Sequence, residues 1–145
     1  MGALLITGSP KGEEGPSAGL PLSFDRRFRP WQYRVGHSEL SFRTVDAGSN
    51  DDFIEIWFTG VLGMKLKTVY ERLHIFVADG PRAADILEFA DVPERHAAKM
   101  WCLALNSDDD SFVVCRGISV WSHPRDAQFD RSGLPKIGST LIFRG

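Results

Sequence analysis

Residues 31–58 read WQYRVGHSELSFRTVDAGSNDDFIEIWF, and their alternation of apolar and polar side chains is typical of antiparallel β-strands. Gly36-His37 suits the two central positions of a type II′ turn, because this turn favours glycine at the first of them. A turn there predicts three cross-strand pairs: Arg34 with Glu39, Tyr33 with Leu40, and Trp31 with Phe42. Each pair joins opposite charges or two large apolar groups, and such pairs stabilise neighbouring strands.

A second turn is predicted at residues 46–52 (DAGSNDD), which are dense in turn-forming side chains. Centring this turn on Ser49 predicts four further pairs: Phe42 with Ile56, Leu40 with Phe58, Thr44 with Ile54, and Arg43 with Glu55. Together, the three strands form a meander whose apolar face carries Trp31, Tyr33, Leu40, Phe42, Ile54, Ile56 and Phe58. A slip of one residue would exchange the two faces, so burial of one face fixes this register.

The rest of the chain predicts more strands and a single helix. We expect strands at Met64–Tyr70, Leu73–Val77 and Lys136–Arg144, and one short helix over residues 81–91, with Pro81 in its first turn and Pro93 ending it. A third hairpin joins Met100–Asn106 to Ser111–Val120 through an acidic turn, and it lies centrally because both of its faces are apolar. The predicted fold is all-β: an antiparallel meander forming a sandwich or a partly closed barrel, with one short helix.

The register of the third hairpin decides where the two cysteines lie. With the turn centred between Asp108 and Asp109, Cys102 stands directly opposite Cys115. In a reducing compartment we expect both to be small core side chains rather than a disulfide.

Composition and charge exclude several function classes. The 145 residues fit one domain, with an N-terminal flexible or extended arm at residues 1–23 and a single β domain at residues 24–145. The net charge of −2, with scattered basic residues, argues against binding to nucleic acid. The N-terminal apolar run, residues 3–6, is too short for a signal peptide or a membrane span, so we expect a cytoplasmic protein.

The sequence contains no complete motif for a cofactor or a metal. Residues 4–11 (LLITGSPK) resemble the phosphate loop that opens flavodoxin-like FMN reductases, but Glu13, Gly15 and Pro16 do not fit the helix that must follow. None of the four histidines, His37, His74, His96 and His123, stands in a metal-binding spacing. We therefore predict no cofactor and no metal, and no motif decides whether the protein is an enzyme.

The candidate site lies on the polar face of the three-stranded meander. Its residues are Arg34, Glu39, Arg43, Glu55 and Trp57. A solvated face crossed by weak salt bridges is the structural alternative.

Three function classes follow from this face. The first is a non-catalytic binding protein, inhibitor- or immunity-like, that holds a protein partner through the aromatic and charged side chains. The second is a small-molecule-binding β-barrel, either a binder or a cyclase- or isomerase-type enzyme, in which Arg43 anchors an anionic group and Glu39 or Glu55 is the acid or base. The third is assembly into a homo-oligomer through a sheet edge or the segment 8–21.

Overall fold

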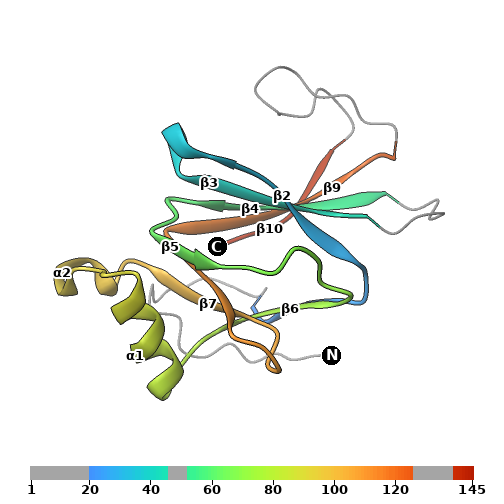
Figure 1. The fold of residues 1–145 in the computed structure, drawn as a ribbon. Helices are drawn as coiled ribbons and strands as arrows, with labels where there is room; N and C mark the ends of the chain where they lie inside the picture. Colours follow the sequence, from blue (N-terminus) through green and yellow to red (C-terminus); the bar gives the residue numbers. More distant parts are fainter. Residues whose placement is uncertain (1–19, 46–51, 126–138) are drawn as a thin grey trace.

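The chain folds as a two-layer β-sandwich in the computed structural model, which describes residues 20–45, 52–125 and 139–145. Its strands form two antiparallel five-stranded sheets that pack face to face (Figure 1). The predicted all-β class is therefore confirmed, and of the two architectures expected, the described strands form the sandwich rather than a closed barrel.

The chain crosses repeatedly between the two sheets. Sheet A has the order β1 (Leu22–Phe24), β6 (Leu73–Val77), β7 (Trp101–Leu105), β8 (Ser111–Cys115) and β5 (Gly63–Lys65). Sheet B has the order β10 (Thr140–Arg144), β9 (Gly117–His123), β4 (Phe53–Thr59), β3 (Glu39–Thr44) and β2 (Phe28–Arg34). The helical segments are η1 (Val35–His37), α1 (Gly80–Phe89) and α2 (Glu94–Ala97).

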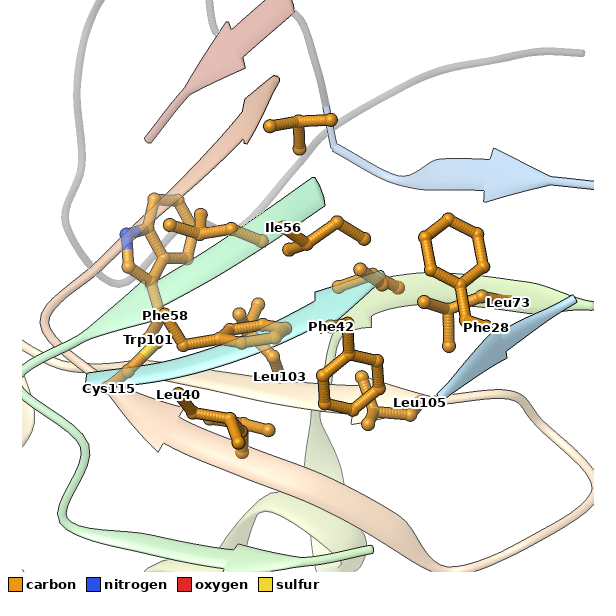
Figure 2. Close-up of a cluster of buried hydrophobic side chains, with 14 of the residues drawn as sticks. Phe28, Leu40, Phe42, Ile56, Phe58, Leu73, Trp101, Leu103, Leu105 and Cys115 are labelled. Carbon is orange, nitrogen blue, oxygen red and sulfur yellow. The ribbon is translucent and has the colours of Figure 1, made fainter. Parts of the chain in front are cut away.

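The main core fills the space between the sheets (Figure 2). Sheet B contributes Phe28, Leu40, Phe42, Ile56 and Phe58, and sheet A contributes Leu73, Ile75, Leu103, Leu105 and Cys115. Burying such a large aliphatic or aromatic side chain stabilises a fold by about 1.5–3 kcal/mol, so this layer supplies most of the driving force.

A second, smaller core lies on the other side of sheet A. There α1 packs through Ile86 against Cys102, Ala104, Phe112 and Val114. The sequence predicted this helix at residues 81–91, and the structure has it at Gly80–Phe89. The hairpin of β7 and β8 is thus covered on both faces, as its two apolar faces predicted.

The register predicted for the second hairpin is confirmed. Leu40 stands opposite Phe58, Phe42 opposite Ile56, and Arg43 opposite Glu55. The backbone nitrogen of Ile54 donates to Thr44 Oγ1 over 3.0 Å. The turn predicted around Ser49 lies outside the described residues.

The first hairpin keeps two of its three predicted pairs. Arg34 faces Glu39 and Tyr33 faces Leu40, but a β-bulge between Pro30 and Gln32 places Pro30, not Trp31, opposite Phe42. The predicted type II′ turn is also wrong, because Val35–His37 forms a 3-10 turn that ends in a left-handed Ser38. The bulge leaves Trp31 52% exposed instead of in the core.

The predicted register of the third hairpin is wrong by one residue. Leu103 pairs with Val113 and Trp101 with Cys115, so Cys102 stands opposite Val114 rather than opposite Cys115. Cys115 consequently faces the main core and Cys102 faces α1. Because both faces of this hairpin are apolar, the alternation of side chains could not distinguish the two registers.

Two strand boundaries also differ from the prediction. The expected strand Ser111–Val120 is two strands, β8 and β9, which belong to different sheets and separate at Arg116. The expected strand Met64–Tyr70 shortens to β5, although Tyr70 forms an isolated bridge with Phe28.

The ends of the chain are described only in part. Residues 20–23 of the expected arm are described, and β1 pairs with β6 from Leu22 onward. Residues 1–19, with the segment resembling a phosphate loop, lie outside the described residues, as does the start of the strand expected at Lys136–Arg144. Across the described ranges, no helix is long and apolar enough to cross a membrane.

Candidate functional site

The five predicted site residues all lie on the outer face of sheet B. Their neighbours in the strands, such as Phe42, Ile56 and Phe58, point into the core, and alternate residues of a strand point to opposite faces. The structure arranges the five as two groups, one containing Arg43 and Glu55 and the other containing Arg34, Glu39 and Trp57.

A buried polar chain runs across three strands of this face and ends beside β10. Arg43 Nε on β3 donates to Glu55 Oε2 on β4 over 2.9 Å. The other carboxylate oxygen, Glu55 Oε1, lies 2.8 Å from His123 Nε2 on β9. The opposite ring nitrogen, His123 Nδ1, lies 2.6 Å from the hydroxyl of Ser139, which immediately precedes β10. We call these four residues the outer-face relay.

Glu55 is ionised in this setting, although its side chain is 0% exposed. Burial alone raises the pKa of the Glu55 carboxyl, but hydrogen bonds to His123 and Arg43, with the charge of Arg43, bring the pKa below the usual 4.5. A buried carboxylate without such partners would be strongly destabilising. Around Glu55, the outer face is therefore not the solvated face with weak salt bridges that the sequence left as the alternative.

The ionised carboxylate also determines where the imidazole proton lies. A carboxylate only accepts hydrogen bonds, so His123 Nε2 must carry a proton toward Glu55. In the neutral imidazole, Nδ1 is then the nitrogen without a proton, and it accepts the hydrogen bond of the Ser139 hydroxyl. The arrangement orients a serine toward a base that is itself held by an acid.

Aromatic rings enclose the relay. The Arg43 guanidinium lies 4.8 Å from the centre of the Trp31 ring and 5.6 Å from that of Phe53. The His123 ring lies 4.9 Å from Phe53 and 6.5 Å from Trp121, to which it is nearly parallel. These rings lower the local polarity, and that strengthens the hydrogen bonds of the relay.

The second group is more exposed and more loosely paired. Arg34 Nη1 lies 3.6 Å from Glu39 Oε1, and the two side chains are 26% and 30% exposed. The Arg34 guanidinium also lies 5.2 Å from the centre of the Trp57 ring. Between the two groups, the buried Ser41 hydroxyl has no hydrogen-bond partner among the described residues.

The sequence did not predict His123 and Ser139 as parts of this site. The prediction ended the strand at Val120, before His123, whereas β9 continues to His123, which pairs with Phe53. Extending the register of β4 onto a fourth strand would have brought His123 beside Glu55. No local signal indicates Ser139, since its contact with His123 depends on how the chain returns to β10.

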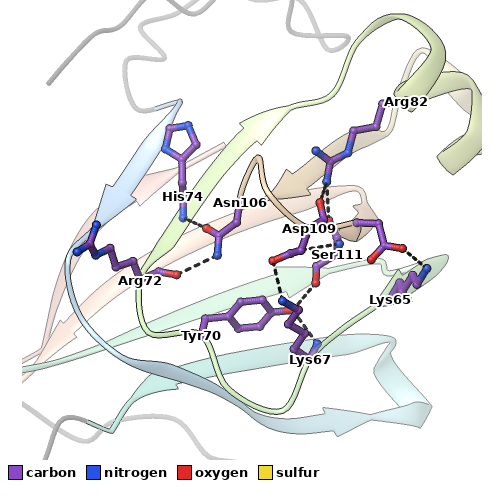
Figure 3. Close-up of polar contacts among 10 residues, drawn as sticks. Lys65, Lys67, Tyr70, Arg72, His74, Arg82, Asn106, Asp109 and Ser111 are labelled. Carbon is purple, nitrogen blue, oxygen red and sulfur yellow. Dashed lines mark hydrogen bonds and ion pairs between the residues drawn. The ribbon is translucent and has the colours of Figure 1, made fainter.

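A separate polar cluster lies at the hairpin end of sheet A (Figure 3). Asn106 accepts from the His74 backbone nitrogen over 2.7 Å and donates to the Arg72 carbonyl over 3.0 Å. The Tyr70 hydroxyl donates to Ser111 Oγ over 2.8 Å, and burial raises the pKa of this hydroxyl above its usual value. These bonds hold both ends of the β7–β8 loop, so the cluster explains the observed hairpin register rather than forming a reactive site.

The acidic turn of this hairpin is neutralised by nearby cations. Asp109 pairs with Lys67 over 3.4 Å, Asp110 pairs with Lys65, and Arg82 donates to the backbone carbonyls of Asp109 and Ser111. In the part of the chain that the structure describes, no group of three or more histidine, cysteine or acidic side chains could hold a metal ion.

Comparison with known proteins does not assign the chain to a family. No family model matches it, and it matches no curated protein and no solved structure.

Proposed function

We propose that this protein binds another protein through the outer face of sheet B and the adjoining edge strand β2. The observation that carries the proposal is the state of Trp31, which is 52% exposed while its ring rests on Arg43. A half-exposed indole on a fixed cation is the kind of side chain that supplies most of the binding energy in protein interfaces.

The support beneath Trp31 is unusually firm for a surface residue. Arg43 is held through Nε by Glu55, which is 0% exposed and is held in turn by His123. Because Arg43 is already ordered, a partner that packs on Trp31 does not have to order this arginine as it binds. Such preorganisation improves affinity by lowering the entropy lost on association.

The chemistry of the face indicates what kind of partner it fits. Arg43 and Arg34 already face Glu55 and Glu39, so these two cations are paired within the face. Trp31 on this face and Val35 at the adjoining turn expose apolar surface. The partner would therefore present an apolar or aromatic surface rather than a strongly charged one.

Side chains, rather than the strand backbone, would make the contact. The edge strand β2 contains Pro30, which has no backbone N–H to donate, and the bulge beside it interrupts the regular ladder. Both features oppose the addition of a further strand at this edge. The small-molecule alternative has less support, because the same face lies outside the sandwich and does not line a barrel interior.

The test compares proteins retained by three immobilised forms of the full chain: wild type, Trp31→Ala and Phe89→Ala. Phe89 is the control because it is an aromatic residue, 64% exposed, on α1 rather than on sheet B. A partner of the proposed face is retained by wild type and Phe89→Ala but lost with Trp31→Ala. Its measured affinity should then fall roughly 30-fold or more with Trp31→Ala, as expected for a hot spot.

Two results would count against the proposal. If wild type and Trp31→Ala retain the same proteins with the same affinity, Trp31 is not the anchor. If sedimentation shows a dimer that Trp31→Ala dissociates, the partner is a second copy of the chain, and the homo-oligomer predicted from the sequence takes the place of a different protein. The cytoplasmic location remains a prediction.

A further inference from the structure

We propose that Ser139 is a nucleophile that His123 and Glu55 activate for acyl transfer from esters with a small apolar acyl group. This inference does not require the proposed protein partner; it rests on the geometry of the outer-face relay, which also supports the proposed binding face. The Ser139 hydroxyl lies 2.6 Å from His123 Nδ1, and His123 Nε2 lies 2.8 Å from Glu55 Oε1. Nucleophile, base and acid thus stand in hydrogen-bonded sequence, which is the arrangement that activates a serine.

The two imidazole nitrogens of His123 have exchanged the roles that they have in the usual serine triad, but the chemistry is equivalent. Glu55 holds Nε2–H and so leaves Nδ1 as the base, whereas in the usual triad the acid holds Nδ1–H. Glu55 is a positioning residue, since it fixes the tautomer and orientation of His123 without facing a substrate. Arg43 holds the second carboxylate oxygen and so limits the rotation of Glu55.

Ser139 is more exposed than the groups that activate it. Ser139 is half-buried, while the side chains of Glu55 and His123 are 0% and 1% exposed. The rings of Phe53 and Trp121 flank His123, and Leu141 pairs with Trp121 across the strands. An acyl group beside Ser139 would thus meet apolar neighbours, and this favours a small apolar acyl chain over a charged one.

The reaction is balanced without any further reactant except water. Ser139 Oγ bonds to the ester carbonyl carbon as its proton passes to His123 Nδ1, and the carbon–oxygen bond to the alcohol breaks as the alcohol oxygen takes up that proton. Water then attacks the acyl-serine and gives a proton to His123 Nδ1, which returns it to Ser139 Oγ as the carboxylic acid leaves. General-base assistance of this kind contributes about 100- to 10,000-fold to a rate.

The protein contains its own matched comparison for this proposal. Ser23 Oγ lies 2.6 Å from His74 Nδ1, the same distance as in the Ser139–His123 pair. Among the described contacts of His74, however, no carboxylate is hydrogen-bonded to its ring. The two serines therefore differ in one respect: the histidine next to Ser139 is hydrogen-bonded to a carboxylate, and the histidine next to Ser23, in its described contacts, is not. We propose that this carboxylate is what activates Ser139.

The experiment treats the folded full-length protein with a fluorophosphonate, a reagent in which attack by a serine oxygen forms an O–P bond and expels fluoride. Peptide mass spectrometry then measures the rate of modification at each serine. We expect an adduct at Ser139 that forms at least about tenfold faster than any adduct at Ser23. The hydrolysis of p-nitrophenyl butyrate should be lost with Ser139→Ala.

Three variants separate activation from structural effects. Ser122→Ala is the control, because Ser122 lies on β9 beside His123 but bonds to Asp52 rather than to an imidazole, and it should keep the full rate. Glu55→Gln removes the ionised acceptor and should slow the modification of Ser139 roughly 100-fold in protein that remains folded by circular dichroism. Its pH–rate profile should also differ from that of wild type, which a purely structural role of Glu55 would not cause.

Several outcomes would overturn the proposal. Equal modification of Ser23 and Ser139, or no adduct at Ser139, would mean that the relay only fastens β10 to the sheet. The same conclusion follows if ester hydrolysis survives Ser139→Ala. The comparison of the two serines within the wild-type chain decides the matter even if Glu55→Gln does not fold.

Discussion

Replacing Arg43 by alanine tests whether the outer-face relay is a buried ion pair that stabilises the fold. The substitution removes the guanidinium that lies 2.9 Å from Glu55, whose side chain is 0% exposed while that of Arg43 is 16% exposed. Removing one partner of a buried pair costs about 3–5 kcal/mol. Since Glu55 keeps its hydrogen bond to His123, we expect Arg43→Ala to lower the free energy of unfolding by about 2–3 kcal/mol.

Arg34→Ala is the matched control for this prediction. Arg34 also lies over an indole ring, at 5.2 Å compared with 4.8 Å for Arg43, but its carboxylate partner is 30% exposed and 3.6 Å away. An exposed pair of this kind contributes about 0–1 kcal/mol. The difference in the free energy of unfolding between the two variants therefore measures the effect of burying Glu55, rather than the effect of losing a cation over an aromatic ring.

The assay is urea unfolding at pH 7, followed by tryptophan fluorescence for each variant. The reasoning is refuted if Arg43→Ala and Arg34→Ala destabilise the protein equally, because the burial of Glu55 would then have no energetic consequence. A further check places Arg43→Ala in a Glu55→Gln background. There the cost of losing Arg43 should fall, since no buried charge is left unpaired.

Three further predictions concern pH, backbone conformation and thiol chemistry. Because the folded-state pKa of Glu55 lies below 4.5, ionised Glu55 contributes fully to the free energy of unfolding above that pH, and this contribution is lost as the pH falls through the lower folded-state pKa. Acid unfolding curves should show this loss of stability in wild type but not in Glu55→Gln. Gly60→Ala should destabilise the fold by about 1–3 kcal/mol, because Gly60 has a φ of +64° and an added Cβ would lie 2.7 Å from a side-chain carbon of Arg116. Gly36→Ala, where nothing lies within 4 Å, should be neutral or slightly stabilising. Thermal unfolding of the two glycine variants measures the difference, and equal effects would contradict this account. Burial raises the pKa of the Cys102 thiol to about 11, so this thiol should resist Ellman's reagent at pH 8 until urea unfolds the protein; rapid reaction in the folded state would show that the α1 side of sheet A opens.

The strand pairing around Arg43 and Glu55 could be predicted because one face of the meander is buried and the other is largely polar. Moving the strands by one residue would place Arg43 and Glu55 in the core, at a large cost in free energy, so the alternation allowed only one register between β3 and β4. The same reasoning failed at Trp31, because an apolar side chain at a sheet edge fits either face and a bulge changes which face it takes.

The register of β7 and β8 could not be predicted in this way. Both faces are apolar, and the decision came from contacts with distant residues: Asn106 with the backbone at residues 72 and 74, and Ser111 with Tyr70. Hydrogen bonds between such distant residues do not leave a periodic pattern in the sequence.

By itself, then, the sequence determined the all-β class, the helix near residues 81–91 and the proximity of Arg43 to Glu55. Each of these follows from interactions between near neighbours or from alternation on a strand. Only the tertiary structure determined the sandwich, the outward position of Trp31 and the relay that adds His123 and Ser139. Its contacts join residues 68 and 16 positions apart, and they form because β9 returns beside β4 and β10 beside β9. That return is set by packing of the whole core, which local side-chain preferences do not encode.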